Sequence, residues 1–132
     1  KTIVFITHDL DEALRIGDQI SILRDGAVIQ DGDPQEIIMQ PADDYIADFM
    51  KDIKRGRVIR VSTLMTKASR AAGPKFESTA LLEDVLTTLN QSKTDSGAVV
   101  DGKGKVIGKI TMKDAIQAIA RPLRAETGTR YK

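Results

Sequence analysis

The chain has 132 residues, of which 41% are apolar, so it can bury the core of one ordinary domain or of two small ones. Lys and Arg total 20 against 19 acidic residues, and this near balance excludes the strongly basic character typical of nucleic-acid-binding proteins. The absence of Cys excludes a disulfide framework and a thiolate metal site, and no apolar run approaches the roughly 18 residues that a membrane span needs.

A short apolar run, Ile3–Ile6, opens the chain and leads to His8 and Asp9. A run this short, rich in β-branched and aromatic residues, predicts a strand that is buried on both faces. Apolar residues then recur at helical spacing from Leu10, and Asp9 and Glu12 have the spacing of a capping box. We therefore expect His8 where a strand gives way to a helix, which is the edge at which open α/β sheets bind ligands.

The segment 5–13, which reads FITHDLDEA, resembles the switch-histidine segment of ABC-transporter ATPases. The resemblance continues through residues 15–18 and 20–29. In that family the histidine contacts the γ-phosphate of bound ATP and helps to position the attacking water, and the resemblance assigns this catalytic role to His8. A histidine at a strand end, taken without its neighbours, is more often one that only hydrogen-bonds its own backbone.

Two apolar runs in the segment 18–31 flank Asp25 and Gly26, and this pattern predicts a β-hairpin because the tight turn needs positive φ at both central residues. The sequence DPQE at 33–36 has the Asp cap and first-turn Pro of a helix start. A second helical pattern over 45–53 carries a stripe of apolar and aromatic residues. Such a stripe favours a core or docking surface over a cofactor site.

The resemblance to ABC ATPases covers residues 1–50 and implies that they are the C-terminal part of an ATP-binding domain. Residues 51–60 differ, because basic residues outnumber acidic ones there, and we expect a linker. The basic residues are Lys51, Lys54, Arg55, Arg57 and Arg60. The linker is either simply solvated or a contact for anionic lipid or nucleotide phosphate.

The pattern from residue 61 to 123 predicts a strand over 61–67, a helix over 80–92, two strands around the turn 101–104, and a last helix that Pro122 ends. This order of strand, helix, strand, strand and helix resembles one CBS motif. Paired CBS motifs form clefts for adenosine-type ligands, so the resemblance implies an adenine nucleotide as a ligand.

The sequence GKITMKD at 108–114 carries the most specific part of the CBS resemblance. In that family a Thr or Ser and an Asp of this stretch hold the phosphate and the ribose, and the resemblance assigns these roles to Thr111 and Asp114. The same two residues also fit a plain helix-capping pattern that needs no ligand. The sequence leaves both interpretations open.

Only one CBS motif is visible, and a unit as small as 61–123 buries little core by itself. We therefore expect it to pair with a second CBS motif or with a second copy of the chain, as a homodimer. Residues 124–132 are expected to form a polar tail. The chain begins within a predicted strand and without Met, so we also expect it to be part of a longer protein.

Together the resemblances imply an α/β (α+β) chain in which the remnant of an ABC ATPase domain precedes one CBS motif. This arrangement resembles the ATP-binding subunits of glycine betaine/proline importers. The implied parent protein uses ATP and Mg²⁺, contacts a permease, and lies on the cytoplasmic face of the plasma membrane. The CBS part is then a sensor of ionic strength or of an adenine nucleotide.

No phosphate-binding loop of the form GxxxxGK[ST] occurs in the chain, and there is a single His. We therefore expect no ATP hydrolysis by these residues alone, no metal site and no nucleophile triad. A second interpretation is a non-enzymatic CBS regulator that binds adenosine nucleotides, and a third is a dimerisation module with an empty cleft. A titration with nucleotides separates these last two.

Overall fold

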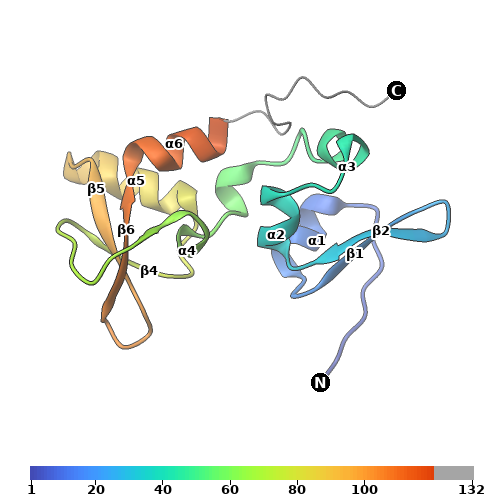
Figure 1. The fold of residues 1–132 in the computed structure, drawn as a ribbon, viewed down its shortest axis with the longest axis horizontal. Helices are drawn as coiled ribbons and strands as arrows, with labels where there is room; N and C mark the ends of the chain where they lie inside the picture. The colour runs from blue at the N-terminus through green and yellow to red at the C-terminus, as the bar shows by residue number, and fades with distance from the viewer. Residues whose placement is uncertain (121–132) are drawn as a thin grey trace. The chain divides into compact units, whose positions relative to one another are not determined.

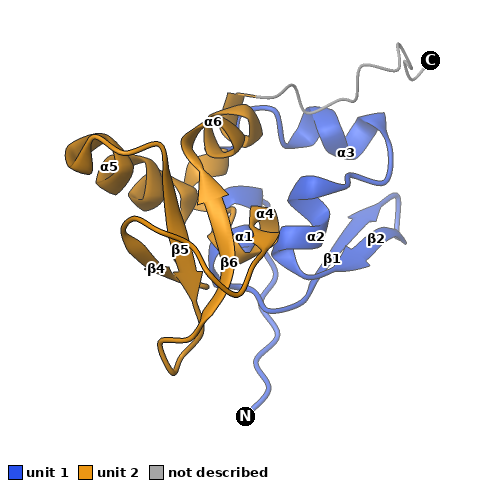
Figure 2. Ribbon diagram, turned by 60° about the vertical axis from the view of Figure 1, so that its left-hand side comes forward, with its two compact units in different colours: residues 1–54, 122–132 blue, residues 55–121 orange. Residues whose placement is uncertain are grey.

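The structure is a computed structural model that describes residues 1–120 (Figure 1). Two compact units follow one another along the chain: unit 1 ends at Lys54 and unit 2 begins at Arg55 (Figure 2). None of the helices in residues 1–120 combines the length and the apolar character of a membrane-spanning helix. The predicted helix stop at Pro122 and the predicted polar tail at 124–132 lie outside the described residues.

Unit 1 consists of three short helices and one hairpin. Its elements are α1 (Leu10–Ile16), β1 (Ile20–Arg24), β2 (Ala27–Gly32), α2 (Pro34–Met39) and α3 (Asp44–Phe49). The strands β1 and β2 pair in antiparallel fashion, and the turn residues Asp25 and Gly26 both have positive φ. The predicted hairpin is therefore confirmed.

Each helix of unit 1 begins at an aspartate cap. The carboxylates of Asp9, Asp33 and Asp43 each accept a hydrogen bond from the backbone N–H of the residue three positions later, at 3.1, 2.9 and 2.9 Å. These bonds satisfy N–H groups that have no partner inside the helix. The most deeply buried side chains of the unit come from the helices α2 and α3 and the residue after them: Ile37, Ile38, Ile46 and Met50.

The predicted buried strand Ile3–Ile6 is wrong for this structure. These four residues form no strand, and their side chains are between 58% and 90% exposed. A strand buried on both faces needs hydrogen-bonded neighbours and covering helices. Within the described part of unit 1, the one sheet is the hairpin of β1 and β2, which does not pair with this segment.

Unit 2 is a four-stranded sheet with two principal helices. Its elements are a 3₁₀ turn η1 (Arg55–Arg57), α4 (Val61–Leu64), β3 (Thr66–Lys67), β4 (Lys75–Glu77), α5 (Leu82–Ser92), β5 (Ser96–Val100), β6 (Val106–Thr111) and α6 (Met112–Ala120). The strand order is β3-β6-β5-β4, with β5 antiparallel to β6 and parallel to β4. The helices α5 and α6 contact each other (Figures 1 and 2). The buried core includes Leu82, Val85, Leu89, Val99 and Ile110.

The order strand, helix, strand, strand, helix is present in unit 2 as β4, α5, β5, β6 and α6, and the mixed α/β class is confirmed. The predicted first strand over 61–67 is wrong in detail. Its first half is the helical turn α4, which forms because the Met65 N–H donates to the carbonyl of Val61 at 2.9 Å. Only β3 at its end is a strand, and the parallel partner of β5 is β4, a strand that the sequence pattern did not predict.

The hairpin between β5 and β6 is confirmed, and Asp101 organises its turn. One carboxylate oxygen of Asp101 accepts from the backbone N–H of Lys105 at 3.0 Å and of Lys103 at 2.9 Å. These two backbone hydrogen bonds, with Lys105 first, lower the pKa of the Asp101 carboxyl below its usual value. The ionised carboxylate of Asp101 therefore stabilises the turn between β5 and β6.

The expected linker over 51–60 differs from the structure in its second half. Arg55 is only 5% exposed, and Gly56, Val58 and Ile59 are also buried. The Arg55 Nε–H donates to the carbonyl oxygen of Ala118, in the last turn of α6, at 2.6 Å. Arg55 is therefore a buried residue of unit 2 and not part of a solvated basic strip.

Candidate functional site

His8 lies at a bend just before α1, with its side chain exposed. The backbone on both sides of His8 is fixed to the first turn of α1. The Thr7 hydroxyl accepts a hydrogen bond from the Asp9 N–H at 3.0 Å and donates one to a Glu12 carboxylate oxygen at 3.2 Å. Within the described chain the imidazole of His8 makes no hydrogen bond to another residue. The side chain is thus presented to solvent from an anchored backbone.

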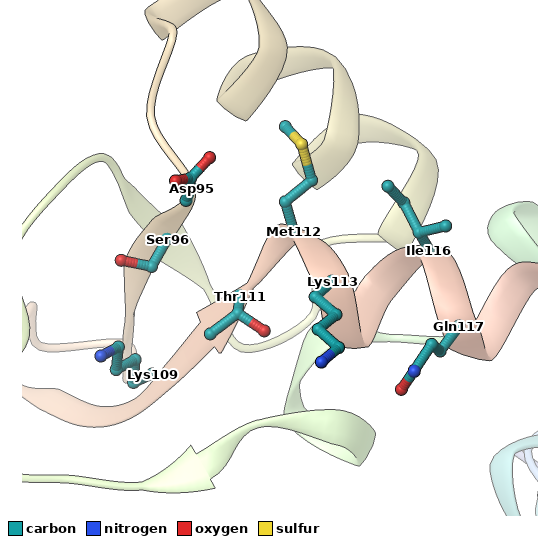
Figure 3. A pocket seen from close by; sticks show the side chains of 8 residues that line it. All are labelled: Asp95, Ser96, Lys109, Thr111, Met112, Lys113, Ile116 and Gln117. Carbon is teal, nitrogen blue, oxygen red and sulfur yellow. The ribbon is translucent and has the colours of Figure 1, made fainter.

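A second candidate site is a hollow of about 700 Å³ in unit 2 (Figure 3). It lies where the end of β6 meets the start of α6, beside the start of β5. Its lining residues are Asp95, Ser96, Lys109, Thr111, Met112, Lys113, Ile116 and Gln117. In Figure 3, Asp95, Met112 and Ile116 lie along one edge of this lining, and Lys109, Lys113 and Gln117 along the other.

Thr111 is the last residue of β6 and is paired with Ser96 of β5. Its hydroxyl oxygen accepts the N–H of Asp114 at 3.1 Å, so it caps the first turn of α6. The helix-capping interpretation of this pair is therefore realised. The hydroxyl also lines the hollow, and its own O–H can still donate to a ligand.

Asp114 does not join Thr111 in the hollow. Its side chain is exposed on α6, and it is not among the lining residues. The carboxylate that does line the hollow belongs to Asp95, whose backbone carbonyl accepts the N–H of Met112 at 2.7 Å. This hydrogen bond fixes the segment before β5 against the start of α6.

Sequence reasoning missed five polar lining residues: Asp95, Ser96, Lys109, Lys113 and Gln117. Lys109 could have been predicted, because alternate residues of a strand share a face and Lys109 stands two positions before Thr111. No sequence pattern pointed to Asp95 and Ser96, since they reach the hollow only through the pairing of β5 with β6.

The hollow offers cations, hydroxyls and an apolar wall to a ligand. Lys109 and Lys113 supply positive charge, Thr111 and Ser96 supply hydroxyl groups, and the side chains of α6 supply apolar surface. This combination can hold an anionic group next to a flat apolar one. No group of three or more His, Asp or Glu residues suited to a metal ion is found in residues 1–120.

No family model matches the chain. The chain is 39% identical over 118 residues to the glycine betaine transport ATP-binding protein OpuAA of Bacillus subtilis, which covers 89% of this chain and 27% of that protein. It is 38% identical over 121 residues to the trimethylamine N-oxide transport system ATP-binding protein TmoW of Ruegeria pomeroyi, covering 92% of this chain and 35% of that protein. The chain thus spans about a third or less of the length of these relatives.

Among solved structures, the chain resembles a CBS-domain pair with bound AMP from Klebsiella pneumoniae, at 19% identity, with 88% of this chain and 86% of that chain covered and a TM-score of 0.33. It also resembles the CBS domain of the bacterial CNNM/CorC family Mg²⁺ transporter in complex with ATP, at 17% identity, with 77% and 63% covered and a TM-score of 0.34. At such low scores these likenesses carry no weight for function.

The sequence similarity extends across both units. An aligned stretch of 118 residues cannot lie within either unit, because the boundary between the units falls between Lys54 and Arg55. The similarity to these ATP-binding proteins therefore includes residues of both units.

Proposed function

We propose that this chain, a relative of the ATP-binding proteins of glycine betaine and trimethylamine N-oxide transport systems, is the C-terminal regulatory part of the ATP-hydrolysing subunit of an importer for betaine- or proline-type osmoprotectants. The observation that supports this most strongly is the 38–39% identity to two such proteins across both units. Residues 1–50 are then the end of an ABC ATP-binding domain, 51–60 connect the two parts, and 61–123 are one CBS motif.

In such a subunit His8 contacts the γ-phosphate of ATP. Its exposed imidazole on an anchored backbone suits this role, because a group that orients an attacking water must be accessible and fixed. The 132 residues contain no Gly-rich phosphate loop, so ATP and Mg²⁺ would be held by other parts of the subunit. His8 is thus the residue of this chain that we assign to ATP hydrolysis.

The CBS part is the regulatory site, and its ligand is an adenine nucleotide bound in the hollow of unit 2. The Thr111 hydroxyl donates to a phosphate oxygen, and the apolar side of the lining receives the base. Occupancy of this site or the ionic strength around the protein then alters the rate of transport.

The partners of the subunit follow from the same proposal. A permease binds the ATP-binding part, which places the protein on the cytoplasmic face of the plasma membrane. A second CBS motif, or a second copy of this chain, pairs with this CBS motif, because a unit this small buries little core by itself.

We expect Thr111→Val to weaken binding of AMP by about tenfold or more, because it removes a hydroxyl that hydrogen-bonds a charged phosphate. Thr111→Ser keeps the hydroxyl and should bind within about threefold of the unchanged chain. Isothermal titration calorimetry of the three proteins with AMP measures the effect. Urea unfolding of the same proteins separates it from loss of the α6 cap.

An equal loss of affinity in Thr111→Ser and Thr111→Val would contradict the role of the hydroxyl. The absence of any heat with AMP, ADP and ATP in the unchanged chain would contradict the nucleotide site itself. The transport function is tested separately, by reconstituting the complete subunit with its permease.

A further inference from the structure

The cationic side of the hollow is built from two lysines that flank one hydroxyl. Lys109 and Thr111 share a face of β6, because they are two residues apart in a strand, and Lys113 follows in the first turn of α6. Figure 3 shows Lys109 and Lys113 on either side of Thr111. The three side chains together form a short polar row at one edge of the hollow.

The charge of these lysines is not neutralised inside the protein. Both side chains are exposed, and within residues 1–120 neither forms an ion pair with an acidic side chain. The one carboxylate of the lining, Asp95, lies along the opposite edge in Figure 3. The row therefore keeps two positive charges that are available to a ligand.

We propose that Lys109 and Lys113 make the hollow selective for ligands that carry two or more adjacent phosphoryl groups over ligands that carry one. This inference rests on the proposed adenine-nucleotide site and names its ligand class as nucleoside di- and triphosphates.

A single phosphoryl group carries a charge of roughly −1.5 to −2 near neutral pH and can contact Thr111 and one lysine. With one phosphoryl group bound at Thr111 and one lysine, the other lysine of the row has no phosphoryl oxygen in direct contact with it. A second, adjacent phosphoryl group supplies that direct contact and adds negative charge along the same row. The energy gained by the longer anion is electrostatic, so the preference should weaken as salt screens the exposed lysines.

The test is a calorimetric titration of the full 132-residue chain with AMP, ADP and ATP at low ionic strength and without Mg²⁺. We expect ADP and ATP to bind at least about tenfold more tightly than AMP, with each of Lys109→Met and Lys113→Met reducing this ratio roughly threefold to fivefold. The double variant should bind the three nucleotides about equally, and inorganic pyrophosphate should displace ADP from the unchanged chain better than phosphate does.

Two control variants separate charge in the hollow from charge and folding in general. Lys105→Met removes a lysine from the β5–β6 turn of the same unit, outside the hollow, and should leave the ADP-to-AMP ratio unchanged. Replacing both lysines of the row by Arg retains the charge and should retain the preference, and circular dichroism checks that each variant is folded.

Equal affinity of the unchanged chain for AMP and ADP, or a preference for ADP that survives in the double Met variant, would overturn the selectivity while leaving the nucleotide site in place. An absence of binding by all three nucleotides would overturn both this inference and the nucleotide site from which it starts.

Discussion

Replacement of Arg55 by Met is expected to lower the free energy of unfolding of unit 2 by about 2–4 kcal/mol. Arg55 is 5% exposed, and its Nε–H donates to the Ala118 carbonyl at 2.6 Å. The last four carbonyls of a helix have no partner within it, so the substitution leaves a buried acceptor unsatisfied. It also removes a positive charge from the negative end of α6, and urea unfolding followed by circular dichroism measures the result.

Arg57→Met is the matched control, because it removes the same side chain two residues away. The Arg57 Nε lies 3.5 Å from a Glu83 carboxylate oxygen, and both side chains are about half exposed, at 48% and 54%. An ion pair in this setting contributes less than about 1 kcal/mol. Similar losses of stability in the two variants would contradict the stabilising role of the buried Arg55 side chain in unit 2.

The burial of Arg55 also changes how ionic-strength sensing by residues 51–60 should be tested. Neutralising Arg55 would damage unit 2 and lower transport for a structural reason. Lys51, Lys54 and Arg57 are exposed, so variants at these three positions remove charge and leave the buried guanidinium in place. An unchanged salt dependence of transport in such variants would argue against a basic strip that contacts anionic lipid.

Replacement of His8 by Ala in the complete subunit is expected to lower the turnover number for ATP hydrolysis by about 100-fold or more. This prediction follows from the proposed contact between the imidazole and the γ-phosphate. A residue that acts on the attacking water affects turnover more than it affects ATP binding, so the dissociation constant for ATP should change by only a few-fold. A phosphate-release assay and a nucleotide-binding titration measure the two quantities.

His8 is exposed, so the substitution should leave the fold unchanged, and the thermal unfolding curve of the variant checks this. A variant that retains more than about a tenth of the original turnover would place the catalytic role elsewhere. A variant that binds ATP much more weakly but turns over at the original rate would make His8 a binding residue only.

The hairpin and the helix starts of unit 1 could be predicted from the sequence, because they depend on local chemistry. Asp25 and Gly26 select a tight turn through their own backbone preferences, and Asp33 caps α2 by a hydrogen bond that spans three residues. Such features depend on neighbours in sequence. The same holds for the turn at Asp101, where all the contacts are made within four residues.

The features that the sequence did not reveal depend on partners far along the chain. Arg55 is buried because its acceptor, Ala118, stands 63 positions later, and nothing near Arg55 signals that contact. The segment Ile3–Ile6 has the composition of a buried strand, but composition alone does not supply a pairing partner. The hollow likewise joins Asp95 to Thr111 across two paired strands, so only the Thr111 side was visible from its motif.

The measurement that tests the proposed function most directly is ATP hydrolysis by the complete subunit, reconstituted with its permease in proteoliposomes. We predict hydrolysis that is stimulated by a betaine-type solute and that responds to ionic strength, and a version lacking residues 55–132 that still hydrolyses ATP but has lost this response. Hydrolysis that is indifferent to the solute, or a response to ionic strength that persists without residues 55–132, would contradict the account.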